Sequence, residues 1–316
     1  MSSKGVTKKD AFLSNVAVTY PTGNLVATEL APILPVQRYA DTIFKDADDA
    51  IDLRNDIAEG TPANRVDFEV GTGVSYKTTR KALSSFILNK TVDNEEDIVK
   101  SEIRETRKLT HRLRLAHEKR AADILTSTSK ITNYVTLETS GQWDNAEFTA
   151  KIWKAQIKTG VEAIYDTVGC SANVMAIPFK CALALANSPV VDDLKYTYSL
   201  EQLTGKIQNQ IHSLVGLPPA LQGLKVVIMD ARLNDANKGE TASKSDLWGD
   251  NVIIGYVPNA SMGEDTHGLL TAEYSPFQVT KEVSTNPRGM EIIVEWDYSF
   301  LEAELGCYYL LRDVLV

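Results

Sequence analysis

The feature that most constrains this fold is a long charged segment, residues 93–125, that contains no helix breaker. Asp93 is placed to accept hydrogen bonds from the first free N–H groups of a helix, and Glu96 follows in the capping-box position. Since neither proline nor glycine interrupts the segment, it predicts one continuous helix, roughly 50 Å long at about 1.5 Å per residue. A compact domain of 316 residues does not need an internal helix of this length.

The apolar residues of this segment recur at helical spacing but form only a narrow stripe. They are Val99, Ile103, Leu109, Leu113, Ala116 and Ile124. Arg, Lys and Glu fill the other faces, so the helix is expected to lie half in the core and half in solvent. A coiled coil is the alternative, although strict heptads are not sustained over four repeats. We favour the interpretation that this helix crosses one face of a flat molecule and directs its charged side chains toward neighbouring copies.

The composition argues against several classes of protein. The formal net charge of −9 and the pI of about 5.1 disfavour a protein that neutralises phosphates with a basic face. Cys170, Cys181 and Cys307 form no CxxC pair, so we expect free, mostly buried thiols in a reducing cytoplasm. No apolar run approaches the roughly 20 residues of a membrane span, and the first residues lack the apolar region of a signal peptide. A soluble protein of one or two domains is therefore expected.

The first 35 residues combine short apolar pieces with Pro21, Gly23, Pro32 and Pro35. Proline-flanked segments are poor helices and favour extended backbone, so residues 1–35 predict an arm that needs another surface to lie on. The apolar residues that favour docking are Phe12, Val16, Val18, Leu25, Ile33 and Leu34. A disordered terminus is an equally good interpretation of residues 1–15.

Residues 65–90 show the alternation of a β-hairpin. Apolar and charged residues alternate from Val66 to Val70, a Gly-Thr-Gly turn follows at 71–73, and a polar run returns toward Leu88. An isolated two-stranded ribbon is marginally stable in water. We therefore expect this hairpin to lie either on its own domain or on a neighbour, and the sequence favours neither.

The remainder of the chain predicts a mixed α/β domain followed by a hairpin. The expected elements are a helix from Asp144 and Glu147 to Val168, a strand at 173–177, a short helix from Pro178 to about Ala186, a helix at 199–215, buried strands at 225–230 and 251–257, and a hairpin of 278–283 with 290–296. Residues 232–246 are polar and are predicted to be a loop.

The motifs of the sequence do not indicate a catalytic or metal site. GTGVSY (71–76) lacks the third glycine of a dinucleotide fingerprint, and STSK (127–130) lacks the partner motif of Ser-x-x-Lys acylases. His111 and His117 lie about 240° apart on the predicted helix, so they cannot share one metal ion and are expected to be solvated or at an interface. Residues 264–267 (EDTH) lack the spacing of a calcium loop. We expect no enzyme activity, no cofactor and no bound metal.

The predicted order is an extended arm, a long hairpin, a long charged helix, an α/β domain and a C-terminal hairpin. This order, together with SDLWGDNVIIGYVPN (245–259) and GMEIIVEWDYSF (289–300), resembles the major capsid proteins of tailed double-stranded DNA bacteriophages with the HK97-type fold. The resemblance covers nearly the whole chain, and WGDNVIIGYV is its most specific part.

The resemblance implies an α+β fold with an N-terminal arm, an extended hairpin loop, a long spine helix, a peripheral domain and an α/β axial domain. The implied parts are the arm (1–35), the first part of the peripheral domain (36–59), the extended loop (60–92), the peripheral domain with the spine helix (93–144), the axial domain (145–270), and the peripheral hairpin with the final strand (271–316).

The resemblance also implies a structural protein that self-assembles as hexamers and pentamers into the icosahedral head around the phage genome. Such a protein is part of the virion and assembles in the bacterial host cytoplasm. The implied partners are other copies of the chain, a separate scaffolding protein, a portal and a decoration protein, while packaged DNA is contacted only non-specifically and no membrane is involved. The candidate contacts between copies are Arg65, Phe68, Lys77, Arg80, Lys81, Glu96, Arg104, Arg107, Arg114, Asn286 and Arg288.

Two alternatives remain open. A bacterial nanocompartment shell of the same fold, similar to encapsulins, would enclose an enzyme cargo instead of DNA. A cytosolic α/β enzyme would use the crevice beyond Ile177, Asp230 or Val257, as open sheets often do, although the chain lacks a glycine-rich or catalytic signature.

Overall fold

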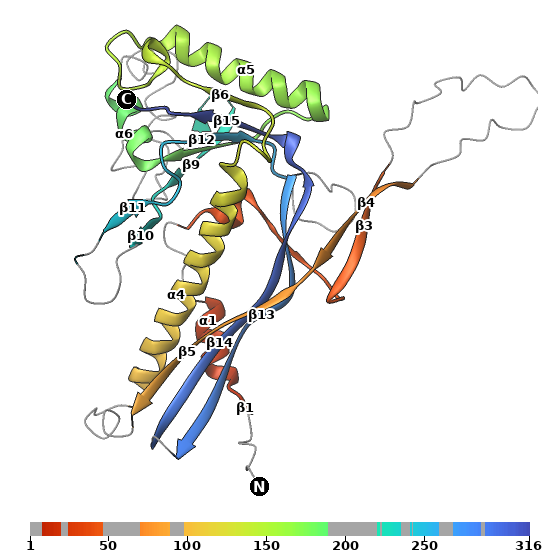
Figure 1. Ribbon diagram of the computed structural model, residues 1–316, viewed down its shortest axis with the longest axis vertical. Coiled ribbons are helices and arrows are strands. Elements are labelled where there is room, and N and C mark those ends of the chain that lie inside the picture. The colour runs from red at the N-terminus through yellow and green to blue at the C-terminus, as the bar shows by residue number, and fades with distance from the viewer. Residues whose placement is uncertain are drawn as a thin grey trace, which may run out of the picture.

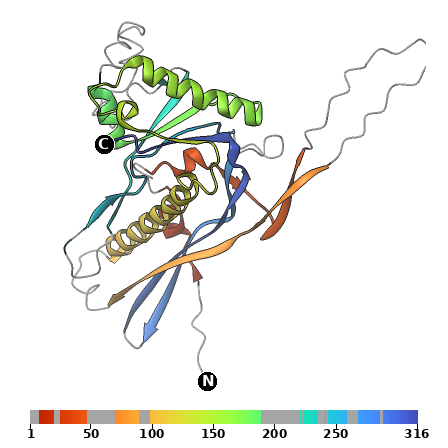
Figure 2. The same cartoon turned by 45° about the horizontal axis from the view of Figure 1, so that its top comes forward.

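The computed structural model consists of two sheets, a long helix beside them and a two-stranded ribbon that stands away from the body (Figures 1 and 2). The residues that it describes are 8–19, 25–46, 70–88, 98–188, 220–221, 223–234, 241, 243–258, 268–285 and 288–316. Among these residues, no helix combines the length and the apolar character that crossing a membrane requires.

The first sheet is built around one long hairpin. Its strands are β1 (Lys8–Lys9), β2 (Ile33–Pro35), β5 (Thr79–Leu88), β13 (Gly268–Thr285) and β14 (Arg288–Glu304). The order is β1-β13-β14-β5, and β2 pairs in parallel with β13. The predicted C-terminal hairpin is confirmed but extends well beyond its predicted ends, because the alternation of buried and exposed residues continues past Trp296 to Glu304.

Helix α4 (Ile98–Leu125) lies across one face of this sheet (Figure 1). Leu109 and Leu113 of α4 pack against Ile292, Val294 and Trp296 of β14, which alternate along the strand and so share one face. The prediction of a long helix that is half buried is therefore confirmed for residues 98–125. The proposed caps Asp93 and Glu96 lie outside the described residues.

The second sheet has six strands in the order β6-β15-β12-β7-β9-β8. They are β6 (Tyr134–Thr136), β7 (Val174–Pro178), β8 (Ala220–Leu221), β9 (Leu224–Met229), β12 (Val252–Gly255) and β15 (Tyr308–Arg312). Helices α5 (Ala150–Val168) and α6 (Phe179–Asn187) cover one face, and α2 (Ala27–Leu30) with the end of α4 covers the other. The predicted buried strands at 173–177, 225–230 and 251–257 are confirmed, because both faces of each are covered.

The hairpin predicted within residues 65–90 is wrong. Strand β4 (Val70–Lys77) pairs antiparallel with β3 (Ala40–Asp46), and β5 continues in the same direction to pair with β14. The expected Gly-Thr-Gly turn at 71–73 lies inside β4. Glycine permits a turn but does not require one. Here the chain stays extended because β4 pairs with β3 and β5 pairs with β14.

The prediction of an extended N-terminal arm is wrong for residues 11–19 and 27–30, whereas Lys8–Lys9 and Ile33–Pro35 are extended and pair with β13. Residues Ala11–Thr19 form helix α1, and Ala27–Leu30 form the short helix α2. Leu13 and Ala17 of α1 are fully buried against the chain's own first sheet and α4. Burial of this apolar face outweighs the β-branched residues and nearby prolines that disfavour helix.

Three smaller predictions differ from the structure. Helix α5 begins at Ala150, because Thr149 caps it by accepting the N–H of Ile152, and not at Asp144 or Glu147. The predicted loop at 232–246 contains two paired strands, β10 (Arg232–Asn234) and β11 (Lys244–Asp246). The final strand, β15, pairs with β12 and β6 in the second sheet, not with the peripheral hairpin.

The remaining short elements are the 3-10 turns η1 (Thr139–Gly141) and η2 (Leu305–Cys307). The predicted helix at 199–215 lies outside the described residues. All three cysteines are free thiols as predicted, with Cys181 and Cys307 buried and Cys170 half-buried.

Candidate assembly surface

The predicted contacts between copies fall into three groups. Arg65, Phe68, Glu96 and Asn286 lie outside the described residues. Lys77, Arg104, Arg107 and Arg288 are exposed on the ribbon, on α4 and at the turn end of the β13–β14 hairpin. Arg80, Lys81 and Arg114 are instead engaged within their own chain.

The ribbon formed by β3 and β4 is the most isolated element of the molecule (Figures 1 and 2). Its base is anchored by the buried ring of Tyr76, which packs with Leu34 and Leu270. Thr78 holds the same end, since both its N–H and its hydroxyl donate to the carbonyl of Tyr39, at 2.9 and 3.1 Å. The attachment extends to the cross-strand pair Ile43 and Val74, which pack partly buried against the same cluster.

Arg80 and Lys81 stiffen the junction between the ribbon and the first sheet. Arg80 forms an ion pair with Glu295 of the neighbouring strand. The Nζ of Lys81 donates to the carbonyl of Tyr298 at 2.6 Å and lies 3.9 Å from the centre of its ring. Burial, followed by the nearby Arg120 guanidinium, lowers the pKa of Lys81 to about 8. Both side chains therefore fix the register of β5 on β14 within one subunit.

Helix α1 is attached at its C-terminal end by Arg114 of α4. The guanidinium donates to the carbonyls of Ala17 and Val18, at 3.3 and 3.2 Å, and lies 5.2 Å from the centre of the Phe277 ring. A cation at this end satisfies free carbonyls and complements the negative pole of the helix dipole. Arg114 is thus a capping residue inside the subunit.

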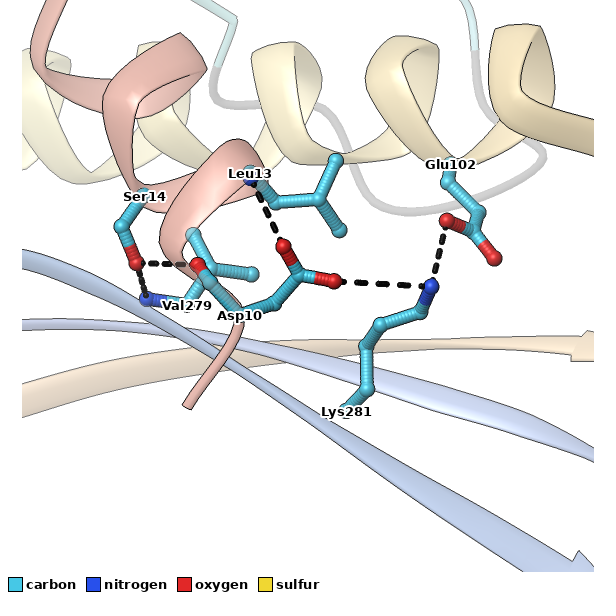
Figure 3. Close-up of polar contacts among 6 residues, drawn as sticks. All are labelled: Asp10, Leu13, Ser14, Glu102, Val279 and Lys281. Atoms are coloured by element: carbon cyan, nitrogen blue, oxygen red, sulfur yellow. Dashed lines mark hydrogen bonds and ion pairs between the residues drawn. The ribbon is translucent and has the colours of Figure 1, made fainter. Parts of the chain in front are cut away.

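The N-terminal end of α1 is attached to the edge of β13 (Figure 3). The Oδ1 of Asp10 accepts the N–H of Leu13 at 3.0 Å, which makes Asp10 the cap of the helix. The hydroxyl of Ser14 donates to the carbonyl of Asp10 at 2.7 Å and accepts the N–H of Val279 at 3.0 Å. These bonds satisfy backbone groups at the helix start and at the strand together.

Lys281 of β13 joins α1 to α4 through two carboxylates (Figure 3). Its Nζ donates to Oε2 of Glu102 at 2.6 Å and lies 3.6 Å from Oδ2 of Asp10. The Glu102 side chain is only 10% exposed, so its charge is compensated mainly by this one cation. The N-terminal segment is therefore locked onto its own subunit by charge as well as by apolar packing.

Glu118 of α4 links the two sheets and explains the Trp-Gly-Asp motif. Its side chain is buried and accepts the N–H groups of Val26 and Ala27 and the indole N–H of Trp248, at 3.1, 2.7 and 2.9 Å. Gly249 has φ of 61°, a left-handed conformation that favours glycine and lets the chain turn back after Trp248. Burial raises the pKa of Glu118, while the three donors oppose that shift.

The prediction that His117 is solvated or at an interface is wrong, because its side chain is buried and only 2% exposed. Its ring lies 4.9 Å from the rings of Trp296, Tyr298 and Phe300, and its Nε2 lies 3.2 Å from the hydroxyl of Thr271. Burial, followed by Arg120, Lys81 and Arg114, lowers the pKa of His117 to about 3. The neutral ring thus serves as a core aromatic. The other histidine of α4, His111, is exposed.

Sequence reasoning missed the residues that organise this region. No motif in the sequence distinguishes Lys281, Glu102 or Glu118 from the other charged residues of an acidic chain. The only available signal for Glu118 was the unusual Trp-Gly-Asp motif, whose indole needs a buried acceptor. No cluster of three or more metal-ligating side chains occurs among the described residues.

Comparisons with known proteins identify solved structures with the same architecture. No protein-family model and no curated protein matches the sequence. Among solved structures, the chain resembles a phage-related protein from Bordetella bronchiseptica RB50 with 22% identity and a TM-score of 0.70, covering 98% of each chain.

Two further structures share the arrangement at lower identity. The capsid of the cyanophage P-SCSP1u has 10% identity and a TM-score of 0.55, with 90% of this chain and 86% of that chain covered. The SrpI encapsulin of Synechococcus elongatus PCC 7942 has 11% identity and a TM-score of 0.50, with 94% and 91% covered. The long helix on a β-hairpin sheet, the second α/β layer and the projecting ribbon are therefore those of the HK97-type capsid fold.

Proposed function

We propose that this chain is a major capsid protein that assembles as hexamers and pentamers into an icosahedral phage head around the genome. In this proposal its role is structural and not enzymatic, it is part of the virion, and it assembles in the host cytoplasm. Its main partner is another copy of the chain. A separate scaffolding protein, a portal and a decoration protein are proposed as further partners.

The observation that carries the proposal is the projecting ribbon. Two-stranded ribbons are marginally stable alone, and the contacts of β3–β4 with the body lie at the end that carries Tyr76, Ile43 and Val74. The hydroxyls of the cross-strand partners Thr42 and Ser75 bond to each other at 3.0 Å, which joins the two strands of the ribbon and not the ribbon to the body. A subunit that extends such an element gains stability when the ribbon lies on a second copy, and many such modest contacts build a lattice.

The first experiment is electron microscopy of the purified full-length protein. Closed shells of uniform diameter are expected, together with a light-scattering mass of many subunits. A protein that stays monomeric at every concentration, salt and pH tested would reject the proposal.

A ribbon excision tests the carrying observation. Residues 44–73 are replaced by Asn-Gly, which joins the cross-strand partners Ile43 and Val74 by a two-residue turn and keeps both of them and Tyr76 in place. We expect the helical circular dichroism signal and the unfolding transition of the body to remain, while shell formation is lost. The matched control carries the substitutions Thr285→Asn and Asn286→Gly. They introduce the same dipeptide at the turn of the β13–β14 hairpin and leave the ribbon intact. Shells formed equally well by the excised protein would contradict the role of the ribbon.

A nanocompartment shell is the second candidate, favoured by the similarity to the encapsulin structure. The two candidates differ in what the particle encloses. Nucleic acid in purified particles, measured by the ratio of absorbance at two ultraviolet wavelengths and by nuclease protection, supports a phage head. A co-purifying enzyme without nucleic acid supports the compartment.

A further inference from the structure

A cavity of about 310 Å³ lies where α1, α2, α4 and the β13–β14 hairpin meet. Its walls are mainly apolar and come from segments that are far apart in the sequence. The apolar lining residues used below are Val18, Leu25, Ile33, Phe277 and Trp296. Ligand pockets in proteins usually have volumes of about 300–1,000 Å³, apolar walls and a few polar groups. The size and the lining of this cavity are therefore those of a site for a small molecule.

Four ionisable side chains line the cavity, and three of them need no ligand to compensate them. Arg114 donates to two carbonyls at the end of α1, at 3.3 and 3.2 Å. The carboxylate of Glu118 accepts three N–H groups, at 3.1, 2.7 and 2.9 Å. His117 is neutral, because burial lowers the pKa of its ring to about 3.

Glu273 of β13 is the exception. Its Oε1 accepts the indole N–H of Trp296 at 2.6 Å, and this carboxylate makes no other hydrogen bond or ion pair with the described residues. The side chain is half-buried, and burial raises its pKa, which the indole only partly opposes. A carboxylate that is partly removed from water gains from a cation that donates a hydrogen bond to it. The Oε2 of Glu273 is available to accept one.

The wall beside Glu273 is aromatic. The rings of Phe277 and Trp296 are stacked, with their centroids 4.6 Å apart and an angle of 27° between their planes. Aromatic side chains offer a large apolar surface to a further ring. A dry cavity of about 150 Å³ holds benzene, so this larger cavity admits one ring with a short alkyl chain.

We propose that this cavity binds a small organic amine, in which an apolar ring carries a short chain and the terminal ammonium donates to Glu273. The ring then lies on the apolar walls, and the ammonium supplies the cation that Glu273 lacks among the described residues. The inference concerns the single subunit and goes beyond the proposed function. Because the walls come from the N-terminal segment, from α4 and from the hairpin, a bound amine stabilises the packing of these parts.

The test measures binding to the dilute full-length protein by isothermal titration calorimetry and by thermal unfolding. The probes are phenethylamine, phenethyl alcohol and hydrocinnamate, which share one ring and differ in the charge of the polar end. We expect phenethylamine to bind most tightly and to raise the midpoint of unfolding as its concentration rises. The alcohol should bind more weakly, and the carboxylate should bind least because Glu273 repels it.

The variant Glu273→Gln removes the charge and keeps an oxygen that can accept the indole N–H of Trp296. It should lower the affinity for phenethylamine by about 10–100-fold and change the affinity for phenethyl alcohol by less than about 3-fold. Glu282→Gln is the matched control, because this half-buried carboxylate belongs to the same strand and lies outside the cavity. Both variants should bind phenethyl alcohol like the parent.

A second variant, Ile33→Trp, fills the cavity with a residue that favours strands. It should abolish the binding of both phenethylamine and phenethyl alcohol, with circular dichroism to verify folding. If this variant does not fold, Glu273→Gln decides the question. Equal affinities for phenethylamine and hydrocinnamate would overturn the inference. So would an unchanged affinity of Glu273→Gln for the amine, or no binding of any probe.

Purified particles distinguish a free amine from a side chain of a neighbouring copy. Phenethylamine bound by particles as well as by dissociated subunits supports the free amine. Binding by dissociated subunits alone would assign the cavity to a neighbouring copy and overturn the inference. Absence of particles counts against the proposed function and leaves the result on dilute protein unaffected, so the two failures are distinguishable.

Discussion

The contact between Glu118 and Trp248 gives the sharpest prediction, since it joins the long helix to the second sheet. Replacing Glu118 by Ala leaves the N–H groups of Val26 and Ala27 and the indole N–H of Trp248 without their acceptor. An unsatisfied buried donor costs about 1–3 kcal/mol, so the three donors together lead us to expect that Glu118→Ala lowers the free energy of unfolding by about 3–9 kcal/mol. That is a large part of the roughly 5–15 kcal/mol that stabilises a typical domain.

A double-mutant cycle isolates the bond to the indole. Glu118→Ala, Trp248→Phe and the double variant are compared with the parent by urea unfolding of dilute, unassembled subunits. A hydrogen bond to a charged group contributes about 1.5–3 kcal/mol, and the coupling energy of the cycle is expected in that range. Should Glu118→Ala fail to fold, Glu118→Gln replaces it, since the amide keeps one acceptor oxygen.

Glu105→Gln is the control, because that carboxylate is on the same helix and bonds the exposed Lys108. A change below about 1 kcal/mol is expected there. A coupling energy near zero between positions 118 and 248, with unchanged m-values, would refute the reasoning that this carboxylate holds the two layers together.

Three further outcomes are expected. His117→Gln should remove an acid-sensitive part of the free energy of unfolding. The pKa of His117, about 3 in the folded chain, lies below the ordinary histidine value of about 6.5, so the unfolded chain binds the proton more readily and stability falls as pH drops below about 6.5. From pH 7 to 5 this loss is about 2 kcal/mol in the parent, measured by urea unfolding at each pH. Lys281→Ala should cost about 2–4 kcal/mol, because Glu102 loses its cation. Gly289→Ala should lower the free energy of unfolding by about 1–3 kcal/mol, measured by thermal unfolding, because the added Cβ would clash with the Ile87 carbonyl oxygen.

Each of these outcomes has a matched control in the chain. His111→Gln removes the exposed histidine of the same helix, Lys108→Ala breaks an exposed ion pair, and Gly141→Ala adds a Cβ whose nearest neighbour is 3.4 Å away. A parent whose acid sensitivity equals that of His117→Gln would show that the buried ring does not set it. Lys281→Ala or Gly289→Ala variants as stable as their controls would likewise contradict the assigned contacts.

Local sequence patterns predicted the helices and strands whose partner elements are close in sequence or whose side chains are uniform in character along one face. The charged run of α4 and the apolar runs of β7, β9 and β12 carry their own periodicity, so their existence followed from the sequence. The course of β4 and β5 did not, because their alternation fits any antiparallel partner and the real partners, β3 and β14, are distant in sequence. Helix α1 was missed because its docking on β13 and α4 outweighs its weak local preference.

The candidate surface was predicted by residue type and less well by role. Basic residues of the loop and the helix were assigned to contacts between copies, yet Lys81 and Arg114 each bond backbone carbonyls of their own subunit. A sequence does not tell which cation finds an internal partner, since that depends on tertiary geometry. The net charge of −9 also concealed the exposed cations of α4, such as Arg104 and Arg107, because a sum over the chain loses the location of each charge.

Strand β15 has a consequence for synthesis on the ribosome. It lies between β12 and β6, so Tyr308–Arg312 must leave the ribosomal tunnel before either neighbour gains its hydrogen-bonded partner on that side. Nascent chains therefore carry an incomplete second sheet until this strand has been synthesised and released.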